Sequence, residues 1–106
     1  MGKRRVSRPS PEPPRTLHTA VVVDEIDLHG LTAAGAERRL RGFLATHAVR
    51  SPDEVVRVIT GRGAHSAGSP VVRERVRDAL DAALREHVAE WAVDMGGGAY
   101  LIRVRG

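Results

Sequence analysis

The sequence predicts an α/β domain, a two-layer sandwich in which two helices pack on a mixed sheet of about four strands, in the order βαβαββ. Three observations indicate this fold. Segments rich in Val and Ile alternate with segments whose apolar residues recur at helical spacing. Two extended segments are each followed by a helix-length segment, which favours parallel strands joined by right-handed crossovers. Three glycines at 96–98 separate the last two extended segments and favour an antiparallel pair.

The composition is that of one small globular domain. The chain has 106 residues, of which 42% are apolar and 28% are charged. It contains no cysteine, which excludes disulfides and thiolate metal sites. The start "MGKRR" is similar to the start of a signal peptide, but no apolar segment follows it, and no apolar run reaches the roughly 20 residues that span a bilayer. We therefore expect a cytoplasmic protein with no membrane partner.

The formal net charge of +4 lies entirely in residues 1–16. That segment holds five basic residues and one acid, whereas residues 17–106 hold 12 of each. Because four of residues 7–15 are prolines, we expect 1–16 to be a disordered basic tail and 17–106 to be the folded domain. The tail either contacts a nucleic-acid backbone, with release of counterions, or is a solvated arm.

The first half of the domain predicts a strand, a helix and a second strand. Residues 20–30 form the first strand, with apolar and polar side chains alternating near its end. Thr32 is the predicted N-cap of a helix that runs to about Ala48 along an apolar stripe. After the turn residues 51–54, the second strand occupies 55–61. We expect the histidines outside the motifs below to lie on the surface: His18, His47 and His87.

The second half predicts a loop, a helix and two strands. Residues 61–70 form a glycine-rich loop, which ends with Ser69 as the N-cap of the second helix. Apolar side chains recur at helical spacing over 72–88, which indicates that the helix opened by Ser69 and Pro70 continues to about Val88. Residues 90–95 and 99–105 are the third and fourth strands.

Polar motifs follow the two parallel strands. "DLHGLT" spans 27–32 and "TGRGAHS" spans 60–66, and the carboxyl ends of parallel strands form the ligand-binding edge of such sheets. Asp27 and His29, two residues apart on a strand, point to the same face, where the carboxylate can orient the imidazole as a general base. Alternatively, Asp27 caps the following turn and His29 hydrogen-bonds the loop backbone. As metal ligands, the two would make an incomplete site.

The second motif has two interpretations. In "TGRG", residues 60–63, backbone N–H groups can cradle a phosphate, with Arg62 as a cation. Alternatively, it is a tight turn that needs glycine dihedrals. It is not a nucleotide-binding signature, because Ser66 replaces the third glycine of G-x-G-x-x-G and residues 69–70 lack the Lys-Ser/Thr of a P-loop. A hydrolase triad of Ser66 with the first motif lacks a nucleophile-elbow pattern.

Three segments together resemble the Smr domain, the small MutS-related domain. They are "IDLHGLT" (26–32), "VITGRGAHSAGSPVVRERV" (58–76) and "GGGAYLIRV" (96–104). The resemblance covers about residues 24–105, although the third segment has one glycine fewer than the usual "GGxGAT". It implies a two-layer α/β sandwich whose motifs meet at one edge. It also implies nucleic-acid binding and, in several members, endonuclease activity that nicks DNA or cleaves RNA.

The resemblance implies catalytic roles for three residues. Asp27 and His29 match the acid and the histidine of the family's first motif, and His65 matches the histidine that follows the second motif in one branch. We predict that His29, oriented by Asp27, activates water or a ribose 2′-hydroxyl as general base, and that His65 protonates the leaving oxygen. A metal-assisted mechanism, in which Asp27 holds Mg²⁺ or Mn²⁺, stays open.

The second motif implies a phosphate site. Gly61, Arg62 and Gly63 match it, and Ser66 follows it. These residues are predicted to bind the phosphate and to stabilise the charge that grows on its oxygens. The main alternative is a nucleic-acid-binding module without catalysis, and a third is an interaction adaptor. DNA and RNA are not separated, because no base-stacking aromatic stands out and Trp91 is assigned to the core.

Overall fold

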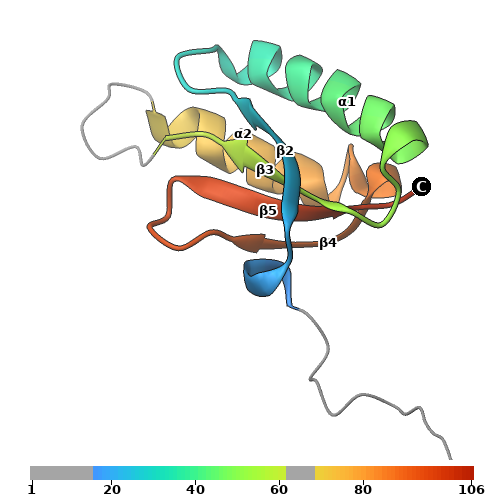
Figure 1. Cartoon of the computed structure of the whole chain (residues 1–106). Helices are drawn as coiled ribbons and strands as arrows, with labels where there is room; N and C mark the ends of the chain where they lie inside the picture. Colours follow the sequence, from blue (N-terminus) through green and yellow to red (C-terminus); the bar gives the residue numbers. More distant parts are fainter. Residues whose placement is uncertain (1–15, 62–68) are drawn as a thin grey trace, which may run out of the picture.

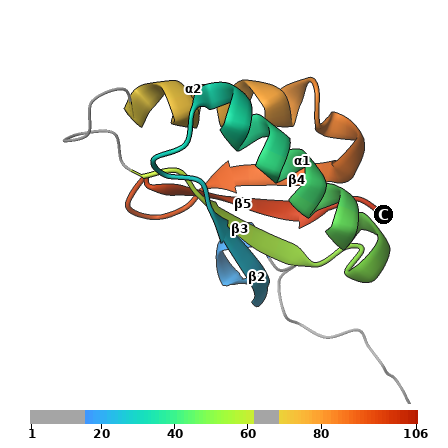
Figure 2. The same ribbon diagram turned by 90° about the horizontal axis from the view of Figure 1, so that it is seen from above.

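The computed structural model describes residues 16–61 and 69–106, which form two layers (Figure 1). Both long helices cover one face of a four-stranded sheet (Figure 2). The predicted α/β fold with its βαβαββ order is thus confirmed. Along the chain the elements are η1 (Leu17–Thr19), β2 (Val22–Asp27), α1 (Ala33–Arg50), β3 (Val55–Ile59), α2 (Ser69–Asp81), η2 (Arg85–His87), β4 (Val88–Val93) and β5 (Ala99–Val104).

The strand order in the sheet is β2-β3-β5-β4. β2 and β3 pair in parallel, as expected for a strand–helix–strand unit, and β5 is antiparallel to both of its neighbours. β4 therefore runs in the same direction as β3, and β5 lies between them. This order makes β2 and β4 the edge strands, and it places the carboxyl ends of β2 and β3 side by side.

The main core lies between the helices and the sheet. Leu40 and Leu44 of α1 pack there against Val58 and Ile102 of the sheet, and all four are fully buried. Trp91 packs against this core and stays partly exposed; its ring meets Tyr100 edge to face at 5.4 Å. On the other face of the sheet lies a smaller buried cluster, in which Leu17 of η1 packs with Val55 of β3 and Leu101 of β5.

The helix ends differ from the predictions in one important place. Thr32 caps α1 as expected, since its side chain accepts a hydrogen bond from the N–H of Gly35 at 3.0 Å. α2 begins at Ser69, as the Ser-Pro start predicted, but it ends at Asp81, so the predicted continuation to about Val88 is wrong. The N–H groups of residues 82, 85 and 87 donate to carbonyls three residues earlier. Such tight turns keep a nearly helical spacing of apolar side chains, which explains the error.

Candidate functional site

Three segments that are distant in sequence meet at the carboxyl ends of β2 and β3. The N–H of Leu28 donates to the carbonyl of Ile59 at 2.7 Å, and the N–H groups of Thr60 and Gly61 donate to the carbonyl of Gly98 at 3.0 and 3.1 Å. Figure 1 shows the β2–α1 and β4–β5 connections at this same end of the sheet. The first motif, the start of the second and the glycine turn at 96–98 therefore adjoin, as the strand order predicted.

Asp27 and His29 form a hydrogen-bonded pair at this edge. One carboxylate oxygen of Asp27, Oδ1, accepts the His29 backbone N–H at 3.0 Å and is 2.6 Å from Nδ1 of the ring. Because an ionised carboxylate only accepts, this bond requires the proton on Nδ1 and leaves Nε2 with the lone pair of the neutral ring. The two interpretations of the pair hold together: Asp27 caps the turn and also orients the imidazole.

The pair is open to solvent. The side chain of His29 is 70% exposed and that of Asp27 is 49% exposed. The hydrogen bond from the His29 ring lowers the pKa of Asp27 below its ordinary value of 3.8, burial opposes this, and the His29 N–H lowers it further. Asp27 is therefore ionised at neutral pH, and the ring beside it is accessible to a large substrate.

We expect the Asp27 carboxylate to make stability depend on pH in the acid range. A carboxyl whose pKa is lower in the folded than in the unfolded state adds stability that is complete above the unfolded pKa and is lost as pH falls through the folded pKa. The free energy of unfolding of the wild-type chain and of Asp27→Asn is measured by chemical unfolding between about pH 2 and about pH 7. The difference between the two free energies should become smaller toward low pH. A difference that stays constant with pH would contradict this.

Gly61 has a conformational role beside His29. Its φ is +85°, and a Cβ added to it would lie 3.7 Å from the Cβ of His29, an ordinary contact. The N–H of Gly61, predicted to bind phosphate, donates instead to Gly98 and is not available to a phosphate in this structure. The tight-turn interpretation is therefore supported at Gly61. The other predicted site residues of this loop lie outside the described residues: Arg62, Gly63, His65 and Ser66.

Two glycine substitutions should change stability in opposite directions. Gly61→Ala should lower the free energy of unfolding by about 1–2 kcal/mol, because a side chain strains a left-handed backbone. Gly42 lies in α1, and a Cβ there meets no atom within 4 Å. Gly42→Ala should therefore raise the free energy of unfolding by about 0.5–1 kcal/mol. Urea unfolding of both variants tests this, and a stabilising Gly61→Ala would show that the turn does not need glycine.

The described residues do not assemble a metal site at this edge. Within 16–61 and 69–106, no group of three or more His, Cys, Asp or Glu side chains is placed to hold a metal ion. Asp27 and His29 are in addition bonded to each other through Oδ1 and Nδ1. Two side chains fall short of the ligand sets that catalytic zinc or magnesium sites use.

His47 lies in an environment that the sequence analysis did not predict. Its side chain is 12% exposed, so its assignment to the surface is wrong. Nε2 is 2.9 Å from a carboxylate oxygen of Asp24, and the ring lies 4.7 Å from that of Phe43. The spacing offered a signal, because His47 follows Phe43 by four residues and Leu44 by three, and so continues the apolar stripe of α1.

The fold and the site define a small α/β domain with a polar edge at the ends of two parallel strands. The family model of the Smr domain matches residues 26–105, most of the chain. The chain therefore belongs to the Smr domain family, and the resemblance seen in its motifs is confirmed. This membership indicates a nucleic-acid-binding or nuclease-type function.

Two further comparisons complete this description. A search of curated proteins finds no match to the chain. Among the described residues, no helix has the length and apolar character needed to cross a membrane.

Proposed function

We propose that this chain is an endonuclease of the Smr type, which cleaves phosphodiester bonds in DNA or RNA. The observation behind the proposal is the His29 ring, which is 70% exposed and bonded through Nδ1 to Asp27 at 2.6 Å. A general base must be oriented, accessible to the substrate and have a free lone pair to accept a proton, and an imidazole held through Nδ1 with its Nε2 open meets all three requirements. Family membership supplies the class of substrate.

In the proposed mechanism, Nε2 of His29 accepts the proton of water or of a ribose 2′-hydroxyl as that oxygen attacks the phosphorus. The bond between phosphorus and the leaving oxygen breaks, and the leaving oxygen takes up a proton. The Asp27 carboxylate keeps the lone pair on Nε2 and stabilises the imidazolium that forms. Asp27 itself remains ionised, in keeping with its lowered pKa.

Other parts of the proposed site rest on the motif resemblance. We assign phosphate binding to Arg62, Ser66 and the N–H of Gly63, and protonation of the leaving oxygen to His65. These four residues lie outside the described residues. Gly61 itself lies beside His29, with the left-handed backbone of a turn.

The alternative function is a nucleic-acid-binding module that holds phosphate without cleaving it. One observation favours it: the Asp27 carboxylate accepts the His29 backbone N–H at 3.0 Å, which gives this acid a structural use that needs no catalysis. A module of this kind would bind nucleic acid as well or better without the negative charge of Asp27.

The test is a cleavage assay with the full chain. Supercoiled plasmid, single-stranded DNA and single-stranded RNA are incubated with the wild-type protein in magnesium, manganese or chelator. His29→Ala is the test variant, and His18→Ala is its control, because His18 is an exposed histidine on η1. Cleavage that is lost in His29→Ala and kept in His18→Ala supports the endonuclease. Binding of every polymer without cleavage by the wild type would establish the binding module instead.

A further inference from the structure

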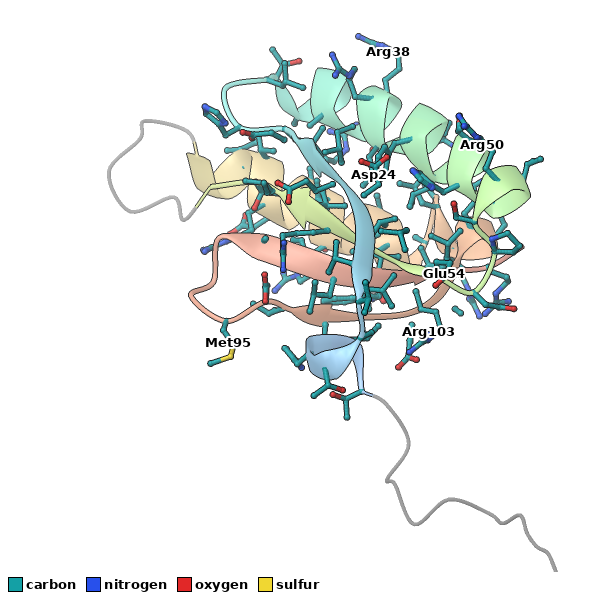
Figure 3. The ribbon with its side chains drawn as sticks, viewed as in Figure 1. Asp24, Arg38, Arg50, Glu54, Met95 and Arg103 are labelled. Carbon is teal, nitrogen blue, oxygen red and sulfur yellow. The ribbon has the colours of Figure 1, made fainter. Side chains whose placement is uncertain are left out.

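A groove separates α1 from the free edge of β2, and three of the residues that line it, Asp24, Arg38 and Arg50, are labelled in Figure 3. Its volume is about 650 Å³. Since β2 is an edge strand, no other strand covers this side of it. Neither Asp27 nor His29 lines the groove, which is therefore distinct from the candidate active site. The charged and titratable residues that line it are Asp24 from β2 and Arg38, Arg39, His47 and Arg50 from α1.

In the part of the chain that the structure describes, no acidic side chain lies within salt-bridge distance of the arginines of this groove. Arg38, Arg39 and Arg50 form no salt bridge with any other described residue, whereas several arginines elsewhere do. Their guanidinium groups therefore remain available to an external anion. Arginine is well suited to phosphate, because its planar group can donate two parallel hydrogen bonds to it. Arginines that form salt bridges elsewhere include Arg41, Arg57, Arg75, Arg77 and Arg103.

The one acid of the groove is already engaged. Asp24 is bonded to Nε2 of His47 at 2.9 Å and accepts the N–H of Glu25 at 2.8 Å. The hydrogen bond to His47 lowers the pKa of Asp24 below its ordinary value of 3.8, and the bond from Glu25 lowers it to a smaller extent. The positive charge of Arg50 also lowers this pKa, with a smaller effect. Three arginines and one aspartate thus line the groove, which has an excess of positive charge.

The opposite edge of the sheet shows a different balance. A groove of about 480 Å³ lies beside β4, and its charged lining consists of two bases and two acids. The balance of charge therefore favours binding of a polyanion in the groove between α1 and β2 over the groove beside β4. The charged residues of the β4 groove are Asp81, Arg85, Glu90 and Arg105.

The groove between α1 and β2 has walls that the chain connects at the candidate active site. Its walls, β2 and α1, are joined by the turn that contains His29 (Figure 1). Arg38 lies nearer that turn, and Arg50 lies at the far end of α1 (Figure 3). Arg50 follows Arg38 by twelve positions along the helix, a length of about 18 Å, which matches roughly five stacked nucleotides.

We propose that the groove between α1 and β2 binds the sugar–phosphate backbone of a nucleic-acid strand, with contacts from Arg38, Arg39 and Arg50. The position of the scissile phosphate at Asp27 and His29 rests on the function proposed above, whereas the binding itself does not. Because the contacts are to phosphates, binding in the groove is independent of base sequence. It is also strongly dependent on salt, because each phosphate contact releases counterions.

The experiment measures binding separately from cleavage. Fluorescence anisotropy of labelled single strands of RNA and of DNA, each about 20 nucleotides long, is recorded with the full chain at several salt concentrations. All variants are made in the His29→Ala background and assayed in chelator. Arg38→Gln/Arg50→Gln is compared with Arg85→Gln/Arg105→Gln, which removes the same charge from the opposite edge. Circular dichroism confirms that both fold.

The groove variant should bind about 10-fold more weakly than its parent. The slope of log binding constant against log salt concentration should become shallower by about 1.4, since each lost phosphate contact to a single strand removes about 0.7. The opposite-edge variant should stay within about twofold of its parent. Equal losses in both variants, or a groove variant that binds like its parent, would overturn the proposal. If the wild-type chain binds nucleic acid but does not cleave it, the proposed endonuclease function is wrong. Weaker binding by the groove variant would still support the proposed binding groove.

Discussion

Replacing Asp27 with asparagine should lower the rate of nucleic-acid cleavage by about 10²- to 10⁴-fold. The carboxylate orients the His29 ring through a 2.6 Å bond to Nδ1 and stabilises the imidazolium that proton transfer creates. An amide has no charge to stabilise that ion, and it can turn its NH₂ toward the ring and favour the other tautomer. The measurement is single-turnover cleavage of the polymer that the wild type cuts.

Binding measured beside the rate separates catalysis from simple phosphate binding. Asp27→Asn should bind uncut strand as well as the wild type or better, because a negative charge near the phosphate is removed. Asp53→Asn is the matched control, since Asp53 lies in the turn after α1 with a φ of 69°, a conformation that asparagine also adopts. Cleavage by Asp27→Asn within about twofold of the wild type would contradict the general-base assignment.

Replacing Leu28 with alanine should lower the free energy of unfolding by about 2–5 kcal/mol. Leu28 is fully buried in the main core, although it stands between two exposed residues of the site. Its truncation removes apolar contacts and leaves a cavity, and small domains have only about 5–15 kcal/mol of stability in total. Urea unfolding monitored by circular dichroism measures the loss.

The control for this variant is Val49→Ala, because Val49 on α1 is 83% exposed. That change should stay within about 0.5 kcal/mol of the wild type. Leu28 also anchors the first motif, since its N–H donates to Ile59 at 2.7 Å. At temperatures where Leu28→Ala is still folded, cleavage should therefore fall as well. A loss of less than about 1 kcal/mol would show that the core closes around the shortened side chain.

Local patterns predicted most of the fold. Alternation in the strands, the apolar stripe of α1 and the Thr32 cap each depend on residues a few positions apart, which the sequence displays directly. The end of α2 was predicted wrongly for the same reason. Val88 continues the helical spacing, but it begins β4, because tight turns after Asp81 preserve that spacing without continuing the helix.

The candidate site was predicted in part. The position of Asp27 and His29 at the ends of parallel strands followed from element order, which sets the edge where ligands bind. The hydrogen bond from Gly61 to Gly98 could not be foreseen, because it depends on how far β5 extends along β3. That register is decided by packing across the whole sheet.

By itself, then, the sequence determined the order of the elements, the family and the pairing of an acid with a histidine two residues later. Only the tertiary structure decided which charges meet. Residues 17–106 have no net charge, yet Arg38, Arg39 and Arg50 line one groove and form no salt bridge with another residue that the structure describes. The physical reason is distance: periodicity is a property of neighbours along the chain, whereas ion pairing and burial depend on contacts between elements that only folding brings together.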